Sequence, residues 1–197
     1  MEQSHKLEIS PARRKELAAI LKWHRVTYDD HAARLPWIFS DEAQSFETRL
    51  HQSFPPGSSN PVDQSNVIQA ARLGGKIVGY YVLGKDPSAK GTIGNHVEDI
   101  HVDADFRRQG IGSALLQHAT SLAQAKDWDA LTAVVWQGNA ASAGLFGGST
   151  FETVCQTWYF GPRRPYRKPA IKKAGLPWQA FQWIVLSGLL GFIIGRN

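Results

Sequence analysis

A seven-residue loop limits the possible folds of this chain more than any other part of the sequence. Residues 107–113 read Arg-Arg-Gln-Gly-Ile-Gly-Ser. They follow a strand expected over 96–102 and open a helix expected over 110–125, in which Leu115, Leu116 and Ala119 recur at helical spacing. A strand that passes through a glycine loop into a helix is typical of layered α/β proteins. The loop therefore predicts an α/β fold.

The same loop is suited to holding phosphate. Gly110 and Gly112 let the backbone approach a ligand and turn its N–H groups outward, and the helix N-terminus adds partial positive charge. The pattern is neither a Walker loop, which needs Gly-Lys-Ser/Thr, nor the six-residue dinucleotide fingerprint. Taken alone, it predicts either a pyrophosphate cradle or a plain turn.

The remaining elements complete a mixed sheet with helices on its faces. Strands are expected over 7–9, 67–73, 76–83, 131–136 and 151–160, and a further helix over 139–146. Ser10-Pro11 and Ser40-Asp41 are typical helix starts, and Gly74-Gly75 predicts a hairpin. The stretch 28–39 contains Pro36 and is expected to be irregular. The resulting order β-α-α-β-β-β-α-β-α-β is typical of an α/β layer arrangement with a mixed sheet.

Residues 97–106, followed by Arg107-x-x-Gly110-x-Gly112, resemble the acetyl-CoA motif of the GNAT superfamily of N-acetyltransferases. The spermidine/spermine acetyltransferases look especially similar here. The likeness continues through Trp136 and Asn139 to Phe146, and the element order matches over residues 7–160. The resemblance implies a GNAT fold and acetyl-CoA as the co-substrate.

The resemblance also implies cofactor-binding roles. Backbone groups of the strand would pair with the pantetheine arm at Ile100, His101 and Val102, where a bulge splays this strand from the next. Backbone N–H groups would hold the pyrophosphate at Arg108, Gln109, Gly110, Ile111, Gly112 and Ser113. Asn139 matches a residue that often touches the pantetheine, with Ser142 nearby, and Asn139 can also cap the helix that follows it.

Acetyl transfer to an amine needs a group that takes the proton of the amine. Glu98 lies at the strand position where several relatives place this base, although a salt bridge or a contact with the substrate's charge is the alternative role. Strand alternation puts Asp99 on the opposite face. Relatives commonly carry a Tyr as the acid where this chain has Phe146, and residues 147–150 read Gly-Gly-Ser-Thr instead of a charged helical turn. His101 is a further residue that can face the substrate.

The other titratable residues form no convincing site. None of the seven histidines has metal-ligand spacing, so no metal is expected, and His24 and His118 are interpreted as ordinary helix residues. Residues 1–162 hold 15 Lys and Arg against 17 Asp and Glu, a net charge of −2, whereas the rest of the chain carries +7. A nucleic-acid-binding domain would carry its positive charge on the folded part, so no nucleic-acid partner is expected. Cys155 is interpreted as a core residue.

The charge pattern divides the chain into a GNAT-like domain (1–162), a basic linker (163–175) and a hydrophobic tail helix (176–197). Residues 178–195 are 18 residues without a charge. As a helix they reach about 27 Å, just enough to cross a bilayer core. The basic run upstream predicts a single-pass membrane anchor with the domain on the cytoplasmic side. A helix lying in the interface or packed on a protein is the alternative. No N-terminal signal peptide is expected.

Within the tail, Ser187, Gly191 and Gly195 recur every four residues, a pattern that favours a partner helix, either a second copy or a subunit of a membrane complex. Two functions are consistent with these observations. The first is a membrane-tethered N-acetyltransferase that acts on a primary amine of a protein or a small molecule. The second is a GNAT-fold subunit with reduced catalysis that docks on a membrane complex through residues 176–195.

Overall fold

The computed structural model describes residues 6–39, 43–59, 67–84 and 96–153, all of which lie in the first unit of the chain, Met1–Tyr166. The elements, in chain order, are β1 Leu7–Pro11, η1 Arg14–Glu16, α1 Leu17–Arg34, α2 Ala43–Ser53, β2 Val67–Leu73, β3 Lys76–Gly84, β4 His96–Val102, η2 Ala104–Phe106, α3 Ile111–Ala125, β5 Thr132–Ala133 and α4 Ala140–Gly147. This order confirms the predicted α/β class.

The strands form one mixed sheet in the order β1-β2-β3-β4-β5. The first four strands pair antiparallel, whereas β4 and β5 are parallel and pair only at His96 with Thr132 and Val97 with Ala133. The β2–β3 hairpin turns at Gly74 and Gly75, whose φ angles of 56° and 79° are favourable for glycine. The predicted hairpin is therefore confirmed.

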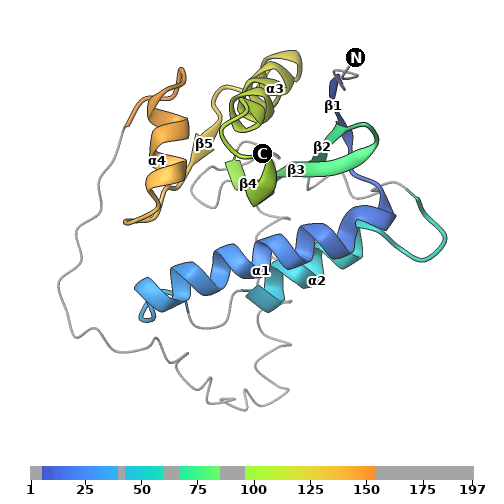
Figure 1. Ribbon diagram of the computed structural model, residues 1–197, viewed down its shortest axis with the longest axis horizontal. Coiled ribbons are helices and arrows are strands. Elements are labelled where there is room, and N and C mark those ends of the chain that lie inside the picture. Colours follow the sequence, from blue (N-terminus) through green and yellow to red (C-terminus); the bar gives the residue numbers. More distant parts are fainter. Residues whose placement is uncertain (1–5, 40–42, 60–66, 85–95, 154–197) are drawn as a thin grey trace, which may run out of the picture. The chain divides into compact units, whose positions relative to one another are not determined.

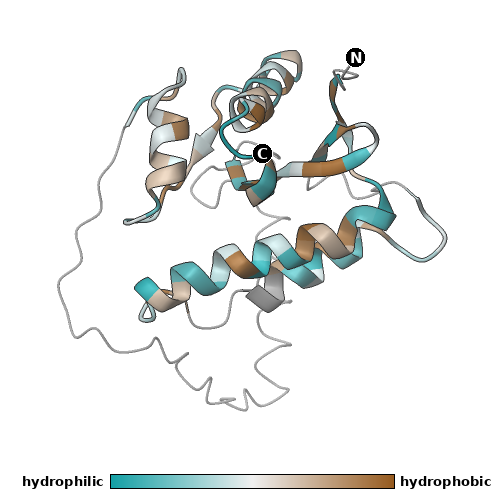
Figure 2. Ribbon diagram, viewed as in Figure 1, coloured by the Kyte–Doolittle hydropathy of each residue, from teal (hydrophilic) through white to brown (hydrophobic). Residues whose placement is uncertain are grey.

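Helices cover both faces of the sheet. Figure 1 shows α1 and α2 side by side along one face of the strands, with α3 on the other side. Apolar residues of α1 and α2 pack against one set of strand side chains, which includes Tyr80 and Val82. The alternate set, which includes Tyr81 and Leu83, packs against α3. Because both faces of β3 are covered, its nearly continuous run of apolar residues is buried. By contrast, α1 mixes apolar and polar residues along its length (Figure 2).

The predicted boundaries near the N-terminus were wrong. Ser10 and Pro11 belong to β1 and pair with Ala70 and Gln69, and α1 begins only at Leu17. Proline is tolerated here because β1 is the first strand in the sheet order, where a missing N–H donor costs little. The stretch expected to be irregular from residue 28 remains helical up to Arg34 and ends before Pro36.

Two further predictions on the C-terminal side differ from the structure. Regular pairing of β5 covers only Thr132–Ala133 instead of residues 131–136. Residues 151–153 are not in a strand, and the rest of the strand predicted over 151–160 lies outside the described residues, as do the linker and the tail helix. Within the described part of the chain, no helix is long and apolar enough to cross a membrane.

Candidate functional site

The sheet splits between β4 and β5. Because β5 pairs only with the first two residues of β4, the remainder of β4 makes no ladder with β5 in the described part of the chain. The three residues expected to pair with pantetheine lie in this stretch: Ile100, His101 and Val102. They pair with β3 on their other side, and the carbonyl of Val102 also accepts a hydrogen bond of 3.0 Å from Arg107 Nε. One edge of β4 therefore faces the split.

A bulge in β4 places two consecutive carboxylates toward the helices. Val82 pairs with Asp99 and Leu83 pairs with Val97, so Glu98 is the extra residue between them. Glu98 forms an ion pair with Arg49 of α2, and Asp99 lies 2.8 Å from His24 of α1. The prediction that Asp99 points to the opposite face from Glu98 was therefore wrong, because the bulge interrupts the alternation.

Asp99 is the centre of a nearly buried polar cluster. Its Oδ2 accepts a hydrogen bond of 2.5 Å from Tyr80 Oη and lies 2.8 Å from His24 Nδ1. Burial, with the negative charge of Asp99, raises the pKa of Tyr80 well above its ordinary value. His24 Nε2 is buried without a partner in the described residues. The prediction that His24 is an ordinary helix residue was wrong, because α1 faces the sheet at this position.

His101 lies next to this cluster on the helix side of β4. Its ring is nearly parallel to the rings of Trp23 and Tyr80, with centroids 5.5 and 6.1 Å away. Its Nδ1 lies 3.2 Å from Thr27 Oγ1. Burial lowers the pKa of His101, although the charge of Asp99 partly opposes the shift. The imidazole is therefore neutral at pH 7.

Asn139 caps α4 and at the same time contacts α1. Its Oδ1 accepts a hydrogen bond of 3.1 Å from the backbone N–H of Ser142, so the capping role predicted for Asn139 is confirmed. Its Nδ2 lies 3.3 Å from Nε2 of His31, whose pKa is lowered by burial. Arg34 also donates to the carbonyl of Gly138. These contacts connect the beginning of α4 to the end of α1.

The loop before α3 offers backbone donors to an anion. Gly110 is the N-cap of α3 with φ 78°, and no side chain of the described residues caps this helix end. The first N–H groups of a helix, here those of Ile111, Gly112 and Ser113, have no partner within the helix. Gly110 is exposed, as are Arg108 and Gln109. The loop therefore fits a pyrophosphate group.

Phe146, at the position where the resemblance predicted a tyrosine in relatives, serves packing in this structure. Its ring meets that of Phe151 edge to face, with centroids 5.1 Å apart, and it packs against the α3 side of the core. A phenyl ring has no proton to donate. The described residues include no group of three His, Cys, Asp or Glu side chains that could hold a metal ion.

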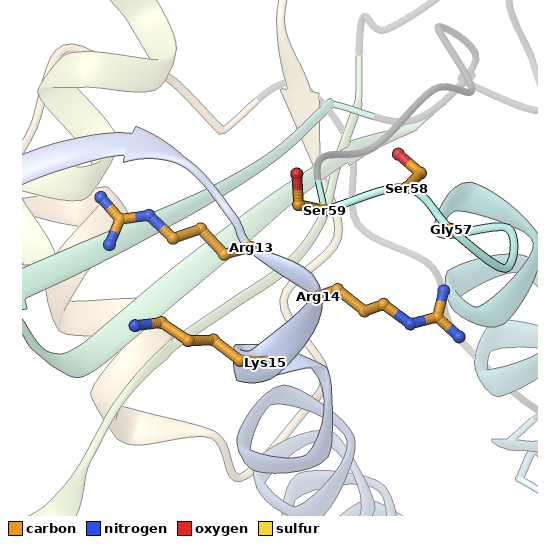
Figure 3. Close-up of a pocket in the computed structure, with 6 residues that line it drawn as sticks. All are labelled: Arg13, Arg14, Lys15, Gly57, Ser58 and Ser59. Carbon is orange, nitrogen blue, oxygen red and sulfur yellow. The ribbon is translucent and has the colours of Figure 1, made fainter.

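A surface pocket of about 830 Å³ lies elsewhere, between η1 and the loop after α2 (Figure 3). It is lined by Arg13, Arg14, Lys15, Gly57, Ser58 and Ser59. The side chain of Arg14 donates to the carbonyls of Phe54 and Pro55, and it extends away from those of Arg13 and Lys15. Because the cationic groups do not converge, this pocket is a poor anion site, and none of its residues belongs to β4 or α3.

The fold and the site thus define an α/β protein whose sheet splits beside an anion-compatible helix N-terminus. The model of the acetyltransferase (GNAT) family matches residues 17–147, well over half of the 197 residues. The chain therefore belongs to the acetyltransferase (GNAT) family, whose acetyl donor is acetyl-CoA. This confirms the predicted superfamily and co-substrate.

Individual relatives are more distant. The L-methionine sulfoximine/L-methionine sulfone acetyltransferase of Pseudomonas aeruginosa is 30% identical over 107 residues, which are 54% of this chain and 56% of that protein. The chain thus matches little more than half the length of this curated relative. A ribosomal-protein-alanine N-acetyltransferase from Brucella melitensis biovar Abortus has a TM-score of 0.56 at 16% identity, over 80% of this chain and 99% of its own. An aminoglycoside 6'-N-acetyltransferase from Acinetobacter haemolyticus has a TM-score of 0.55 at 16% identity, over 78% and 97%. These two structures share the fold.

Proposed function

We propose that this protein is an acetyl-CoA-dependent N-acetyltransferase that acts on a primary amine. The observation that carries the proposal is the split between β4 and β5. It lies beside the uncapped N-terminus of α3, and the polar residues His24 and Thr27 of α1 contact β4 next to it. When bound, acetyl-CoA supplies a thioester acetyl group. The chain has to hold that group, orient the amine and remove its proton.

The proposed cofactor site uses the two backbone features described above. The free edge of β4 at Ile100 and His101 would pair with the amides of the pantetheine arm, as a strand pairs with a peptide. The N–H groups from Arg108 to Ser113 would hold the pyrophosphate, where the helix N-terminus favours negative charge. Asn139 and Ser142 remain in the proposal as neighbours of the pantetheine, although the side chain of Asn139 already caps α4.

The acceptor side would lie between β4 and the helices α1 and α2. Glu98 is held by Arg49 from α2, and both side chains are partly exposed, at 26% and 41%. A carboxylate in this position can attract an ammonium group as well as take its proton, so the role predicted for Glu98 remains a proposal. The relatives described above are named for L-methionine sulfoximine or sulfone, a ribosomal-protein alanine and an aminoglycoside. We propose a small-molecule amine, since the relative detected by sequence acts on an amino acid derivative.

Calorimetric titration of acetyl-CoA into the full chain tests the cofactor site. Micromolar binding that weakens at least tenfold in Gly110→Val is expected, because valine is strained at a φ of 78°. Gln117→Val, an exposed change on α3, is the matched control. Release of free thiol is then followed with L-methionine sulfone, neamine and an alanine-starting peptide as probes. A folded protein that binds no acetyl-CoA would refute the proposal and favour the docking-subunit alternative.

For the tail we propose a membrane anchor formed by residues 176–195, with the domain on the cytoplasmic side. The support comes from the sequence: 18 uncharged residues from 178 to 195, preceded by a basic run. Sedimentation of the full chain with anionic vesicles tests it. Leu189→Arg should release the protein, since an arginine at the centre of a spanning helix costs about 3 kcal/mol. Gln117→Arg on α3 is the control for added charge, and equal sedimentation of both variants would refute the anchor.

A further inference from the structure

We propose that His101 is the residue that takes the proton of the acceptor amine, and that Thr27 positions it by fixing which ring nitrogen is free. The inference rests on the proposed function and deepens it. It starts from the hydrogen bonds of two side chains that face each other across α1 and β4, Thr27 and His101. No local pattern connects these two residues, because they are 74 positions apart.

The hydrogen-bond inventory fixes the tautomer of His101. A threonine hydroxyl has one hydrogen, and that of Thr27 is donated to the carbonyl of Trp23 at 3.1 Å. Thr27 Oγ1 can therefore only accept from His101 Nδ1, which lies 3.2 Å away. We therefore assign the ring hydrogen to Nδ1. In the neutral imidazole, Nε2 then bears the free lone pair, which is the form needed to accept a proton.

The surroundings of His101 keep this lone pair available. Nε2 makes no hydrogen bond to any described residue, and the His101 side chain is half-buried. The rings of Trp23 and Tyr80 lie nearly parallel to the imidazole, with centroids 5.5 and 6.1 Å from its own. The side chain lies on the stretch of β4 that borders the split, where the acetyl group would be presented.

The charged groups around His101 act in opposite directions. On its own strand Asp99 favours the protonated ring, and so does Asp103 just beyond the strand. Arg107 from the following loop and His24 from α1 disfavour it, and the Tyr80 hydroxyl on β3 is bound to Asp99. Burial outweighs these charges and lowers the pKa below the ordinary value of 6.5. The ring is thus neutral before the reaction, and Asp99 stabilises the imidazolium that forms.

The proton transfer itself balances without another reactant. The ammonium form of the acceptor loses one N–H proton to Nε2, which leaves a neutral amine with a nucleophilic lone pair and a His101 imidazolium. The imidazolium then releases the proton to water. Glu98 is the competing acceptor, but its carboxylate is already bound by Arg49. We assign Glu98 to attracting the ammonium group and His101 to its deprotonation.

Nitrogen NMR of the histidine side chains in the full chain tests the geometry without any turnover. With the signal assigned by its loss in His101→Gln, we expect Nδ1 to be protonated and Nε2 to be unprotonated at pH 7.5. Thr27→Val removes the acceptor and should produce a mixture of tautomers, whereas Thr27→Ser should restore the single form. A protonated Nε2 in the wild-type protein, or an unchanged tautomer in Thr27→Val, would overturn the assignment.

Kinetics with the amine that the wild-type protein acetylates tests the role. His101→Gln should lower kcat by about 100-fold or more, the usual range for a general base, and should abolish the acid limb of the pH profile of kcat/KM, whose midpoint lies below 6.5 in the wild type. Thr27→Val should lower kcat, and Thr27→Ser should rescue it. Turnover that survives His101→Gln, or an acid limb that disappears in Glu98→Gln instead, refutes the role of His101 and leaves the proposed function untouched. Absence of wild-type acetyl-CoA binding refutes the proposed function.

Discussion

The buried ion pair between Glu16 and Arg72 should be one of the most sensitive points of the fold. The two side chains are 5% and 1% exposed, and two hydrogen bonds of 2.7 Å join the carboxylate to the guanidinium. Arg72 also donates to Ser10 Oγ and to the carbonyl of Pro11, and Glu16 accepts from the backbone N–H of Arg13. The pair thus joins β1, β2 and the start of α1, the helix that carries His24 and Thr27 of the site.

Glu16→Gln keeps the size of the side chain but leaves the Arg72 charge buried without its partner. Breaking such a pair costs about 3–5 kcal/mol. For a chain of this size that corresponds to a fall in Tm of roughly 6–20 °C. Urea and thermal unfolding measure it, with Glu152→Gln at an exposed position outside the helices and strands as the control, for which a change within about 0.5 kcal/mol is expected. The double variant Glu16→Leu/Arg72→Met should recover much of the loss, since it removes both charges.

The same pair predicts a specific dependence on pH. Burial by itself raises the pKa of Glu16, but the hydrogen bonds and charge of Arg72 hold it below its ordinary value of 4.5. The unfolded chain therefore binds this proton at a higher pH than the folded one. The stability difference between wild type and Glu16→Gln should be constant above about pH 5 and should shrink as the pH falls through the folded pKa. A difference below 1 kcal/mol at pH 7, or one that grows on acidification, would refute the reasoning.

Three further outcomes follow from the geometry of the site. Gly79→Ala should destabilise the protein and weaken acetyl-CoA binding, because its Cβ would lie 2.7 Å from the carbonyl oxygen of His101. Gly75→Ala should cost only the strain of its positive φ, because its Cβ would meet nothing within 4 Å. Chemical denaturation compares the stability of the two variants. Asp99→Asn should lower the pKa of His101 further, because the substitution removes a negative charge that raises this pKa. A histidine NMR titration measures the pKa, and an unchanged or raised pKa would contradict the expectation. Asn139→Ala should destabilise the protein by about 1 kcal/mol through loss of the α4 cap, as measured by urea unfolding, with recovery in Asn139→Asp.

The parts of the fold that the sequence predicted are those with strong local signals. Gly74-Gly75 between two apolar runs identified the hairpin, and Gly110 before an apolar helix identified the start of α3 within one residue. Ser10-Pro11 is an equally good local signal for a helix start, yet it failed. The five ladder positions between β1 and β2 outweigh a capping preference of about 1 kcal/mol. Local signals are reliable where no competing tertiary pairing is available.

The residues of the site that the sequence analysis missed come from other elements. His24 and Thr27 lie on α1, and Tyr80 lies on β3, far in sequence from the motif of β4. The one available signal was the helical spacing of His24, Thr27 and His31, which puts three polar side chains on one face of α1. His24 is interpreted as an ordinary helix residue in the sequence analysis, which does not use this spacing. In the structure His24 and Thr27 contact Asp99 and His101 of β4, and His31 contacts Asn139 at the start of α4.

The bulge at Glu98 explains why alternation could not assign the faces of β4. Counting back from His101, Asp99 and Val97 would share the helix face, and Glu98 would point away from it. The extra residue instead turns Val97 into the α3 side of the core and brings Glu98 onto the same side as Asp99. One inserted residue therefore gives the site two adjacent carboxylates, of which one is held by α2 and the other by α1. A strand without the bulge would offer only one of them, and the separation of charge attraction from proton transfer proposed above depends on having both.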